Sequence, residues 1–295
     1  MPSLTARRAA AKAARMERES PAAEPGEATA EPEQKESWWE TIRFLLILFA
    51  ITLFVRTFVF APFSIPSGSM LPNLMIGDYL FVTKWPYGWS RYAMPFGIGG
   101  FEGRIAGALP DRGDIVVFRY PGQEEEDYVK RVIGLPGDRI EVRGGVVILN
   151  GAPVPRQRIA DYVMPVSANS PCRVVGNDPE AGAQRSSDGE ECHYPRYRET
   201  LPGGRSYDVL DQGGSRADEF EAIVVPDGHL FVMGDNRDDS EDSRVPLEEG
   251  GVGLLPTENL IGEALIAFWS TDGSAGWLPW TWLSAARWER IGRTY

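Results

Sequence analysis

Residues 114–120 read DIVVFRY and residues 128–133 read YVKRVI, two short runs rich in β-branched and aromatic side chains. Such residues are enriched in strands, and Gly, Pro and Asp bound both runs as turn residues do. Six more runs have the same character: residues 78–84, 138–142, 146–150, 222–225, 230–233 and 264–269. The 32 glycines and 23 prolines of the 295-residue chain imply many turns, so the sequence predicts a mainly β body.

The second run contains Lys130, whose position in the strand makes it a candidate base. The strand period of two places Lys130 on the face of Tyr128 and Val132, and Arg131 on the opposite face. An unperturbed lysine, with a pKa of about 10.4, is neutral in roughly one molecule in 2,500 at pH 7. Burial lowers that pKa, and a desolvated lysine can take a proton from a serine. From this segment alone, a solvent-exposed lysine is the alternative.

Residues 65–72, IPSGSMLP, hold the candidate nucleophile. Gly68 has no Cβ to crowd the turn, so a neighbouring hydroxyl can stand clear of the backbone, and the flanking prolines stiffen both sides. The sequence has no Gly-x-Ser-x-Gly motif, and its only histidines are His193 and His229. A Ser-His-Asp hydrolase is therefore poorly supported, and a reactive serine in this turn would need another base.

A strongly apolar segment precedes this turn. Residues 44–55 read FLLILFAITLFV without a charge, and the apolar character resumes after Arg56 as far as Phe63. This length is close to the roughly 20 residues that cross a bilayer core, and Arg56 can snorkel to the headgroups. We therefore predict a transmembrane anchor over residues 37–63. The alternatives are a buried helix and a cleaved signal sequence, although a cleaved signal would lie nearer the terminus and end at small residues.

The composition of the N-terminal region sets the expected orientation. Residues 1–36 contain no aromatic residue and are rich in Ala, Pro, Glu and Arg, so we predict a disordered tail. By the positive-inside rule, the basic residues before and at the edge of the anchor place the N-terminus in the cytoplasm and the rest of the chain outside. These residues are Arg7, Arg8, Lys12, Arg15, Arg18, Lys35 and Arg43. The formal net charge of −12 argues against nucleic-acid binding.

The C-terminal region contains a tryptophan-rich tract. Residues 277–283, WLPWTWL, are too short and too interrupted by proline to span a bilayer. Their tryptophans fit either a membrane interface or the edge of a hydrophobic core.

Residues 156–220 are polar and loop-like in composition, which suggests an inserted subdomain. Both cysteines, Cys172 and Cys192, lie in it. In an oxidising compartment we expect a disulfide between them that closes a loop in a poorly cored region. A metal site made of the two cysteines and His193 lacks a fourth ligand and the usual close spacing.

Residues 234–244, GDNRDDSEDSR, form a dense polar segment. Such a segment can be a solvated loop or a calcium site. It lacks the full spacing of a calcium loop and the closing glutamate, so no calcium site is expected.

Taken together, these segments resemble bacterial type I signal peptidase. That family carries a Pro-Ser-x-Ser-Met box just past a membrane anchor, as at residues 66–70. A Gly-Asp-hydrophobic box follows, here within residues 112–118, and then a Lys-Arg-x-x-Gly-x-Pro-Gly-Asp box, here at residues 130–138. The last box is Gly-Asp-Asn-x-x-x-Ser-x-Asp-Ser-Arg, here at residues 234–244. Four ordered boxes make the resemblance specific, and it covers about residues 38–290.

The resemblance implies a role for each matched residue. Ser69 is the implied nucleophile and Lys130 the implied general base, with no cofactor or metal. The Ser67 hydroxyl and the Ser69 backbone N–H form the implied oxyanion hole. Ser240 matches the serine that orients the lysine amine, and Asp242 and Arg244 match a supporting ion pair. The implied substrate-binding residues line shallow pockets for small side chains or pair with an extended substrate; they are Ile65, Pro66, Met70, Asp127, Tyr128 and Val129.

The resemblance also implies the fold. We expect an antiparallel β-sheet catalytic core over residues 64–155 and 221–295, with a loop-rich insertion at residues 156–220. One N-terminal transmembrane helix precedes this core. Many family members have an aromatic residue after the last arginine of the final box, where this chain has Val245. This departure puts the shape of that loop in doubt but not the chemistry.

The implied function is that of a serine endopeptidase in the bacterial cytoplasmic membrane, with its catalytic domain on the periplasmic or outer side. It would cleave signal peptides from exported preproteins after small residues at the first and third positions before the cut, through an acyl-enzyme. The implied partners are signal peptides and membrane lipid. The alternatives are a self-cleaving repressor relative, which the anchor and the lack of a basic DNA-binding segment disfavour, and a non-catalytic scaffold that binds exported chains.

Overall fold

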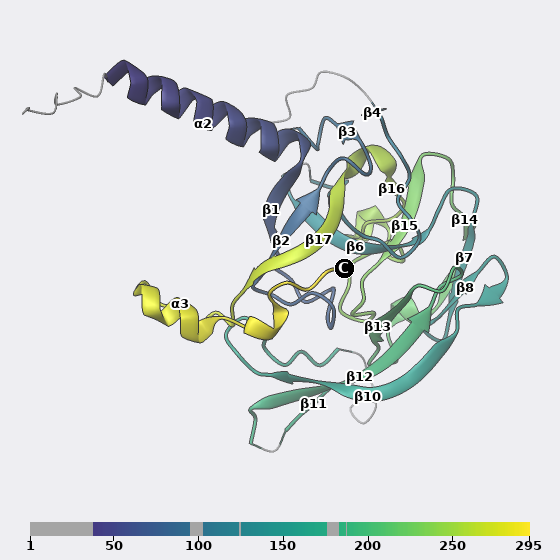
Figure 1. Ribbon diagram of the computed structural model, residues 1–295. Coiled ribbons are helices and arrows are strands. Elements are labelled where there is room, and N and C mark those ends of the chain that lie inside the picture. The colour runs from purple at the N-terminus through teal and green to yellow at the C-terminus, as the bar shows by residue number, and fades with distance from the viewer. Residues whose placement is uncertain (1–37, 95–102, 124, 176–182, 187) are drawn as a thin grey trace, which may run out of the picture. The chain divides into compact units, whose positions relative to one another are not determined.

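The computed structural model describes residues 38–94, 103–123, 125–175, 183–186 and 188–295 (Figure 1). The chain divides within its first described helix into two compact units, one that ends at Leu48 and one that covers Phe49–Tyr295. The second unit holds all the strands of the described residues. The predicted tail at residues 1–36 lies outside them.

Strands make up most of the second unit. They are β1 (Phe60–Ser64), β2 (Asp78–Thr83), β3 (Trp89–Ser90), β4 (Arg104–Ile105), β5 (Ile115–Arg119), β6 (Asp127–Gly134), β7 (Arg139–Arg143), β8 (Val146–Leu149), β9 (Ala152–Pro153), β10 (Arg156–Pro165), β11 (Gln184–Arg185), β12 (Glu191–Thr200), β13 (Ser206–Leu210), β14 (Phe220–Val224), β15 (His229–Met233), β16 (Leu255–Pro256) and β17 (Leu260–Ser270). The helices are α2 (Trp38–Phe58) and α3 (Pro279–Ala285), and the short 3-10 helices are η2 (Arg216–Asp218), η3 (Leu247–Glu249), η4 (Thr257–Asn259) and η5 (Trp288–Arg290).

A seven-stranded antiparallel sheet is the frame of this unit, with the strand order β1-β2-β17-β5-β6-β15-β16. A second sheet has the order β14-β7-β8-β9, and β3 pairs with β4. The predicted mainly β, antiparallel fold is therefore confirmed. The eight predicted strands match observed ones to within two residues, except that β17 starts at Leu260 rather than at Ala264.

The core lies on both faces of the central strand β5. Its residues Ile115 and Val117 pack in one hydrophobic cluster with Leu80, while Val116 and Phe118 pack in another with Val132. A strand that is covered on both faces is apolar at every position rather than at every second one. This burial explains why the DIVVFRY run is so continuously hydrophobic.

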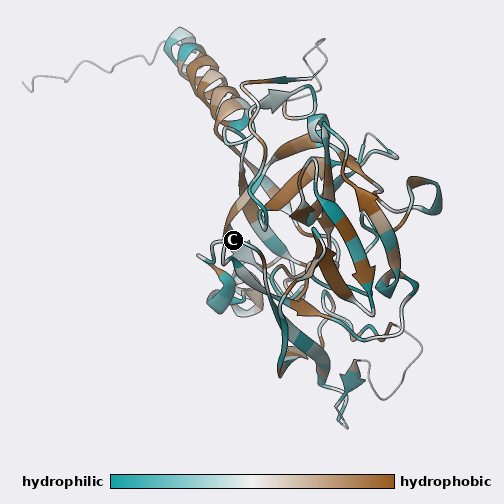
Figure 2. Cartoon of the chain, turned by 90° about the vertical axis from the view of Figure 1, so that its right-hand side faces the viewer, coloured by the Kyte–Doolittle hydropathy of each residue, from teal (hydrophilic) through white to brown (hydrophobic). Residues whose placement is uncertain are grey.

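Helix α2 ends earlier than the sequence predicted. It stops at Phe58, and the next residues form strand β1, where Phe60 faces Thr83 of β2. The prediction of an anchor that extends to residue 63 is therefore wrong at its C-terminal end. Pro62 explains the difference, because it disfavours the helical conformation for Ala61 and is tolerated in an edge strand such as β1. The 21 residues of α2, largely hydrophobic in Figure 2, still make it long and apolar enough to cross a membrane.

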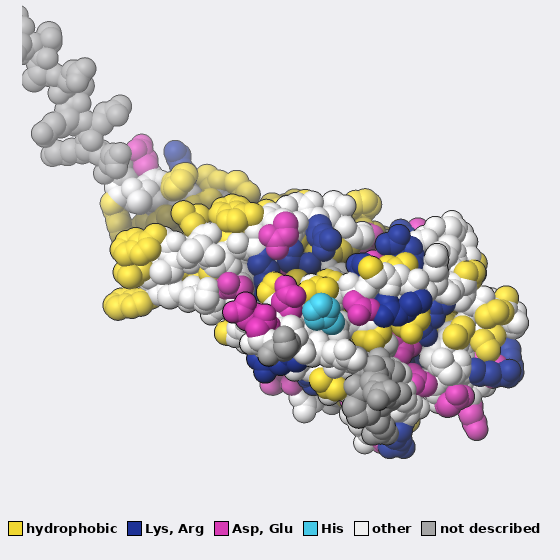
Figure 3. Space-filling model, turned by 90° about the horizontal axis from the view of Figure 1, so that it is seen from below, with side chains coloured by type: hydrophobic (Ala, Val, Ile, Leu, Met, Phe, Trp, Pro, Cys, Tyr) yellow, Lys and Arg dark blue, Asp and Glu magenta, His cyan; other side chains and the backbone are white. Residues whose placement is uncertain are grey.

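The insertion is built on a sheet. Strands β10, β12, β11 and β13 form a four-stranded antiparallel sheet, so the description of residues 156–220 as loop-rich is wrong for the residues that the structure describes. Cys192 and Tyr194 of β12 are buried, whereas the face seen in Figure 3 carries mixed acidic and basic side chains. A sheet with one solvated face alternates apolar and polar residues, and the polar residues of that face contribute to the polar composition of the segment.

The tryptophan-rich C-terminal tract is exposed. It forms the end of a loop and helix α3, in which Trp277 is 94% exposed and Trp280 is 66% exposed. The predicted alternative that these side chains lie at the edge of a core is therefore wrong.

Candidate active site

The turn that carries Ser69 lies between β1 and β2 and is held from two sides. Ile65 donates its N–H to the Asp78 carbonyl at 2.9 Å and accepts from Gly77 at 3.1 Å. On the other side, the Asn236 N–H donates to the Ser69 carbonyl at 3.0 Å, and Asn236 Nδ2 donates to the Gly68 carbonyl at 3.1 Å. These contacts fix the turn against the segment of residues 234–244.

Lys130 of β6 reaches this turn. Its Nζ donates a hydrogen bond to Ser69 Oγ at 2.7 Å, and the lysine is only 3% exposed. Burial lowers the pKa of Lys130 to about 8, against an opposing attraction from Asp242. At such a pKa, about a tenth of the molecules carry a neutral amine at pH 7, compared with about one in 2,500 for a free lysine.

The next residue along β6 points the other way. The Arg131 guanidinium donates to both carboxylate oxygens of Asp235, each at 2.7 Å, and lies over the Tyr207 ring. Asn73 Nδ2 also donates to Asp235 Oδ2 at 2.7 Å. The Lys130 face of β6 therefore meets the serine turn, while the Arg131 face is tied into a buried ionic network.

The two predicted oxyanion donors, the Ser67 hydroxyl and the Ser69 backbone N–H, lie beside the Ser69 side chain. Ser67 is exposed, and its Oγ lies 3.4 Å from Ser69 Oγ. Among the described residues, the Ser69 backbone N–H has no hydrogen-bond acceptor. An N–H and a hydroxyl beside a reactive oxygen can stabilise negative charge that develops there.

The predicted support residues differ in what they contact. Asp242 accepts hydrogen bonds from Gly234 N–H at 2.9 Å, Arg244 Nε at 2.9 Å and Arg244 Nη2 at 2.8 Å. Burial opposes the charge of Asp242, but the Arg244 guanidinium and these donors hold its pKa below the usual range. Ser240 Oγ is buried and has no hydrogen-bond partner among the described residues, so the structure does not join it to Lys130.

Gly234 allows these groups to approach one another. A Cβ at this position would lie 2.2 Å from Ser240 Oγ and 2.6 Å from the Ser69 carbonyl oxygen. Both distances are far below van der Waals contact, so only glycine fits between the two serines.

A cavity of about 1000 Å³ opens over the Ser69–Lys130 pair. Its walls come from residues 65–70, 126–130, 172–175 and 238–241. All six predicted substrate-binding residues lie on these walls, namely Ile65, Pro66, Met70, Asp127, Tyr128 and Val129. Neither His193 nor His229 lines the cavity.

One edge of β6 is open at this cavity. Strand β15 pairs with β6 only from Arg131 to Gly134, whereas β5 pairs with it as far as Asp127. Among the described strands, Asp127, Tyr128 and Val129 therefore have a neighbour on one side only. An edge of this kind can accept an extended peptide as an added strand.

Sequence reasoning missed the ionic network beneath the site. The Arg237 guanidinium binds both carboxylate oxygens of Glu199, at 2.6 and 2.5 Å, and Tyr207 Oη donates to the same carboxylate at 3.0 Å. Arg237 and Glu199 are each 1% exposed, and Glu199 belongs to β12 of the insertion. Arg237 lies inside a recognised box and could have been singled out, whereas nothing in the local sequence marks Glu199.

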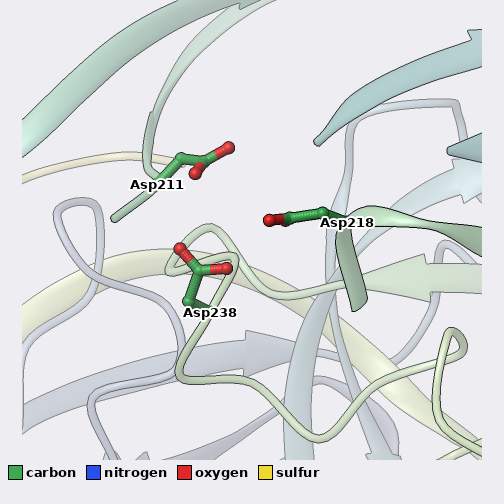
Figure 4. Close-up of side chains that lie close together, drawn as sticks. All are labelled: Asp211, Asp218 and Asp238. Carbon is green, nitrogen blue, oxygen red and sulfur yellow. The ribbon is translucent and has the colours of Figure 1, made fainter. Parts of the chain in front are cut away.

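Three carboxylates also gather at the junction of the insertion and the site. The ligand oxygens of Asp211, Asp218 and Asp238 lie within 4.8 Å of one another (Figure 4). Arg156 donates to Asp211 at 2.5 Å, and Asp238 accepts the backbone N–H of Gln212 at 2.6 Å. Burial and the neighbouring carboxylates raise the pKa of Asp238. A counter-ion and backbone donors thus already satisfy part of this group.

The Ser69 hydroxyl, the buried Lys130 amine and the cavity lie together, which is the arrangement that a serine hydrolase with lysine as its base would need. The family model for signal peptidase, peptidase S26, matches residues 38–269. Signal peptidase I of Rickettsia akari is 34% identical over 278 residues, which cover 88% of this chain and 92% of the relative. Signal peptidase I of Rickettsia typhi is 36% identical over 230 residues, which cover 75% of this chain and 76% of the relative. The chain belongs to the signal peptidase family, peptidase S26, and is a serine peptidase.

A solved structure of a signal peptidase I from Enterococcus faecalis V583 is also similar. It is 24% identical and covers 53% of this chain and 97% of that one, with a TM-score of 0.28.

Proposed function

We propose that the protein is a membrane-anchored endopeptidase that removes signal peptides from exported preproteins. The single observation that carries the mechanism is the 2.7 Å hydrogen bond between Lys130 Nζ and Ser69 Oγ on the wall of the cavity. Burial supplies a neutral amine, and the turn supplies a hydroxyl within its reach.

In the proposed reaction, neutral Lys130 accepts the Ser69 proton as Oγ attacks the scissile carbonyl carbon. The Ser67 hydroxyl and the Ser69 N–H donate to the resulting oxyanion. Collapse of this intermediate breaks the C–N bond, and the Lys130 ammonium returns the proton to the leaving amine. Water then attacks the acyl carbon while Lys130 accepts its proton. The ester C–O bond breaks, the second product leaves, and the Lys130 ammonium returns the proton to Ser69 Oγ.

Ser240 is assigned a role in the substrate complex. Its Oγ is buried and has no hydrogen-bond partner in the described part of the chain. A Cβ on Gly234 would touch both this oxygen and the Ser69 carbonyl oxygen, so the two lie on either side of the glycine. We propose that it accepts a hydrogen bond from Lys130 once substrate excludes water, because catalytic hydrogen bonds often tighten only in the complex. The Asp242–Arg244 pair holds the loop that carries Ser240.

The substrate is an extended peptide that adds to the open edge of β6 at Asp127–Val129. We propose that Ile65 and Met70, which line the cavity, contact small residues at the first and third positions before the cut. This pattern is what the implied signal-peptide specificity requires.

The anchor sets the location of the reaction. Helix α2 would span the bacterial cytoplasmic membrane once, with the N-terminus in the cytoplasm and the catalytic domain outside. At most about 40 Å of extended chain separates Phe58 from Ser69, which keeps the site close to the lipid from which a signal peptide emerges. Membrane lipid is thus a second partner.

The test is cleavage of a purified preprotein by the full-length protein in detergent, with sequencing of the new N-terminus. The proposal expects one cut after a small residue, no cut by Ser69→Ala, and unchanged cleavage in EDTA. Wild-type binding of the preprotein without cleavage would favour the non-catalytic scaffold, and loss of cleavage in EDTA would indicate a metal mechanism.

A further inference from the structure

One wall of the cavity comes from the insertion rather than from the catalytic sheets. Residues 172–175, Cys-Arg-Val-Val, line the same space as Ser69, Lys130 and the open edge of β6. None of the four recognised boxes contains these residues, and the proposed reaction leaves them without a role.

Contacts with strand β12 of the insertion hold this wall in place. Cys172 is joined by a disulfide to Cys192, which is fully buried in β12, with a Cα–Cα distance of 5.4 Å. Arg173 N–H donates to Tyr194 Oη at 3.0 Å, and Tyr194 is also buried. The insertion sheet therefore positions the backbone of the wall.

A second tie joins the wall to the loops near the catalytic pair. Gln212, 1% exposed, accepts the Val175 N–H at 2.9 Å and donates through Nε2 to the Arg173 carbonyl at 3.3 Å. The Arg173 side chain pairs with Asp239 at 2.9 Å, and Asp239 immediately precedes Ser240. The wall thus has fixed contacts with both the insertion and the catalytic loop.

An apolar side chain that is largely exposed to solvent lies between these contacts. Val174 is 59% exposed although its neighbours are anchored on both sides. Burial of apolar surface is favourable, and a peptide that fills the cavity would remove part of the exposed Val174 side chain from water. An apolar side chain on the wall of a peptide-sized cavity is what a substrate contact requires.

We propose that Val174 is a substrate-binding residue that contacts an apolar side chain of the bound peptide, and that the Cys172–Cys192 disulfide positions it. This inference rests on the proposed function of the same cavity. It assigns to the insertion a part in specificity, while the chemistry stays with Ser69 and Lys130.

Binding to the Ser69→Ala protein tests the inference without requiring cleavage. The probe is a fluorescent peptide that spans a signal-peptide cleavage site, measured by anisotropy in detergent. Val174→Ser should raise the Kd about three- to tenfold, as expected for one lost apolar contact. Val163→Ser is the matched control, because Val163 is 42% exposed on β10 of the same insertion and does not line the cavity.

A peptide series identifies the contacted position. Each peptide of the series has one apolar residue replaced by serine. The Kd of each peptide is measured for the Ser69→Ala protein and for the Ser69→Ala/Val174→Ser protein. One position should couple to Val174, so that its substitution weakens binding only when Val174 is present. Equal Kd values for the Val174→Ser and Val163→Ser proteins, or no coupled position, would overturn the inference.

The disulfide is tested in the active protein. Cys172→Ser/Cys192→Ser should raise KM more than Val174→Ser does while kcat stays within about twofold, since the chemistry lies elsewhere. A fall in kcat with KM unchanged would contradict a binding role. If wild-type protein binds the peptide through Val174 but does not cut it, the proposed function fails and the assignment of the wall stands.

Discussion

Two buried lysines invite comparison, Lys84 just after β2 and Lys130 in β6. They are 5% and 3% exposed, and burial lowers the pKa of each to about 8. Lys84 Nζ donates to the Ala93 carbonyl at 2.5 Å, whereas Lys130 Nζ donates to the Ser69 hydroxyl at 2.7 Å. A carbonyl oxygen has no proton to give, and Lys84 does not line the cavity. Burial can therefore lower the pKa of an amine, but a general base also needs a nucleophile and a space for substrate beside it.

The largest expected effect separates these two lysines directly. Lys130→Met should lower kcat/KM for preprotein cleavage by at least about a thousandfold, because it removes the amine that contacts the Ser69 hydroxyl. Lys84→Met, the matched control, should keep cleavage within about threefold. Comparable losses in both variants would mean that Lys130 acts through the fold rather than through the reaction.

The pH dependence of the rate should follow Lys130. Its lowered pKa, about 8, means that the active neutral amine is lost as the pH falls, so kcat/KM should drop about tenfold per pH unit below 8. Above about pH 9 the profile should level off. Lys84→Met should leave this acidic limb in place, and a profile that is flat between pH 6 and 8 would exclude the neutral lysine as the base.

Ser240 has an intermediate expected effect. Ser240→Ala should lower kcat about tenfold with little change in thermal stability, because the hydroxyl has no partner among the described residues and is proposed to accept from Lys130 only in the complex. Kinetics and thermal denaturation are measured on the same sample. Unchanged kcat would show that Lys130 is oriented without Ser240.

The last prediction concerns the free energy of unfolding rather than catalysis. The pKa of Lys130 falls from 10.5 in the unfolded chain to about 8 in the folded protein. The unfolded state therefore binds more protons between these two values, and the free energy of unfolding decreases as the pH falls from about 10.5 through about 8. Lys130→Met should therefore stabilise the protein at pH 7 by up to about 3 kcal/mol, an advantage that shrinks toward pH 10. Lys84→Met should gain less, since it leaves the Ala93 carbonyl without its donor. Melting temperatures of both variants at pH 7 and pH 10 provide the check, and an advantage that grows with pH would contradict the lowered pKa.

The sequence was sufficient for the strands of the catalytic core. The apolar runs around Val117 and Val132 predicted strands because β-branched residues and turn signals are local features. The period of two likewise predicted that Lys130 and Arg131 point to opposite faces. The ordered boxes then singled out Ser69 as the partner of Lys130, although those residues are 61 positions apart.

The features that the sequence did not reveal depend on contacts between distant segments. The insertion sheet follows from pairing between β10 and β12, which are separated by more than 20 residues. Glu199 becomes part of the site's support only because β12 brings it to Arg237. Val174 becomes a wall of the cavity only because Cys192 and Gln212 hold its segment there.

The most direct measurement is an NMR titration of the lysine side chains in full-length protein labelled with ¹³C at Cε. The chain has only four lysines, Lys12, Lys35, Lys84 and Lys130, and the two methionine variants assign the buried pair. The account predicts that Lys130 titrates near pH 8 and that its midpoint coincides with the acidic limb of kcat/KM, while the Lys84 midpoint can be removed without moving that limb. A Lys130 midpoint near 10.4, or an acidic limb that does not follow it, would contradict the claim that a neutral Lys130 activates Ser69.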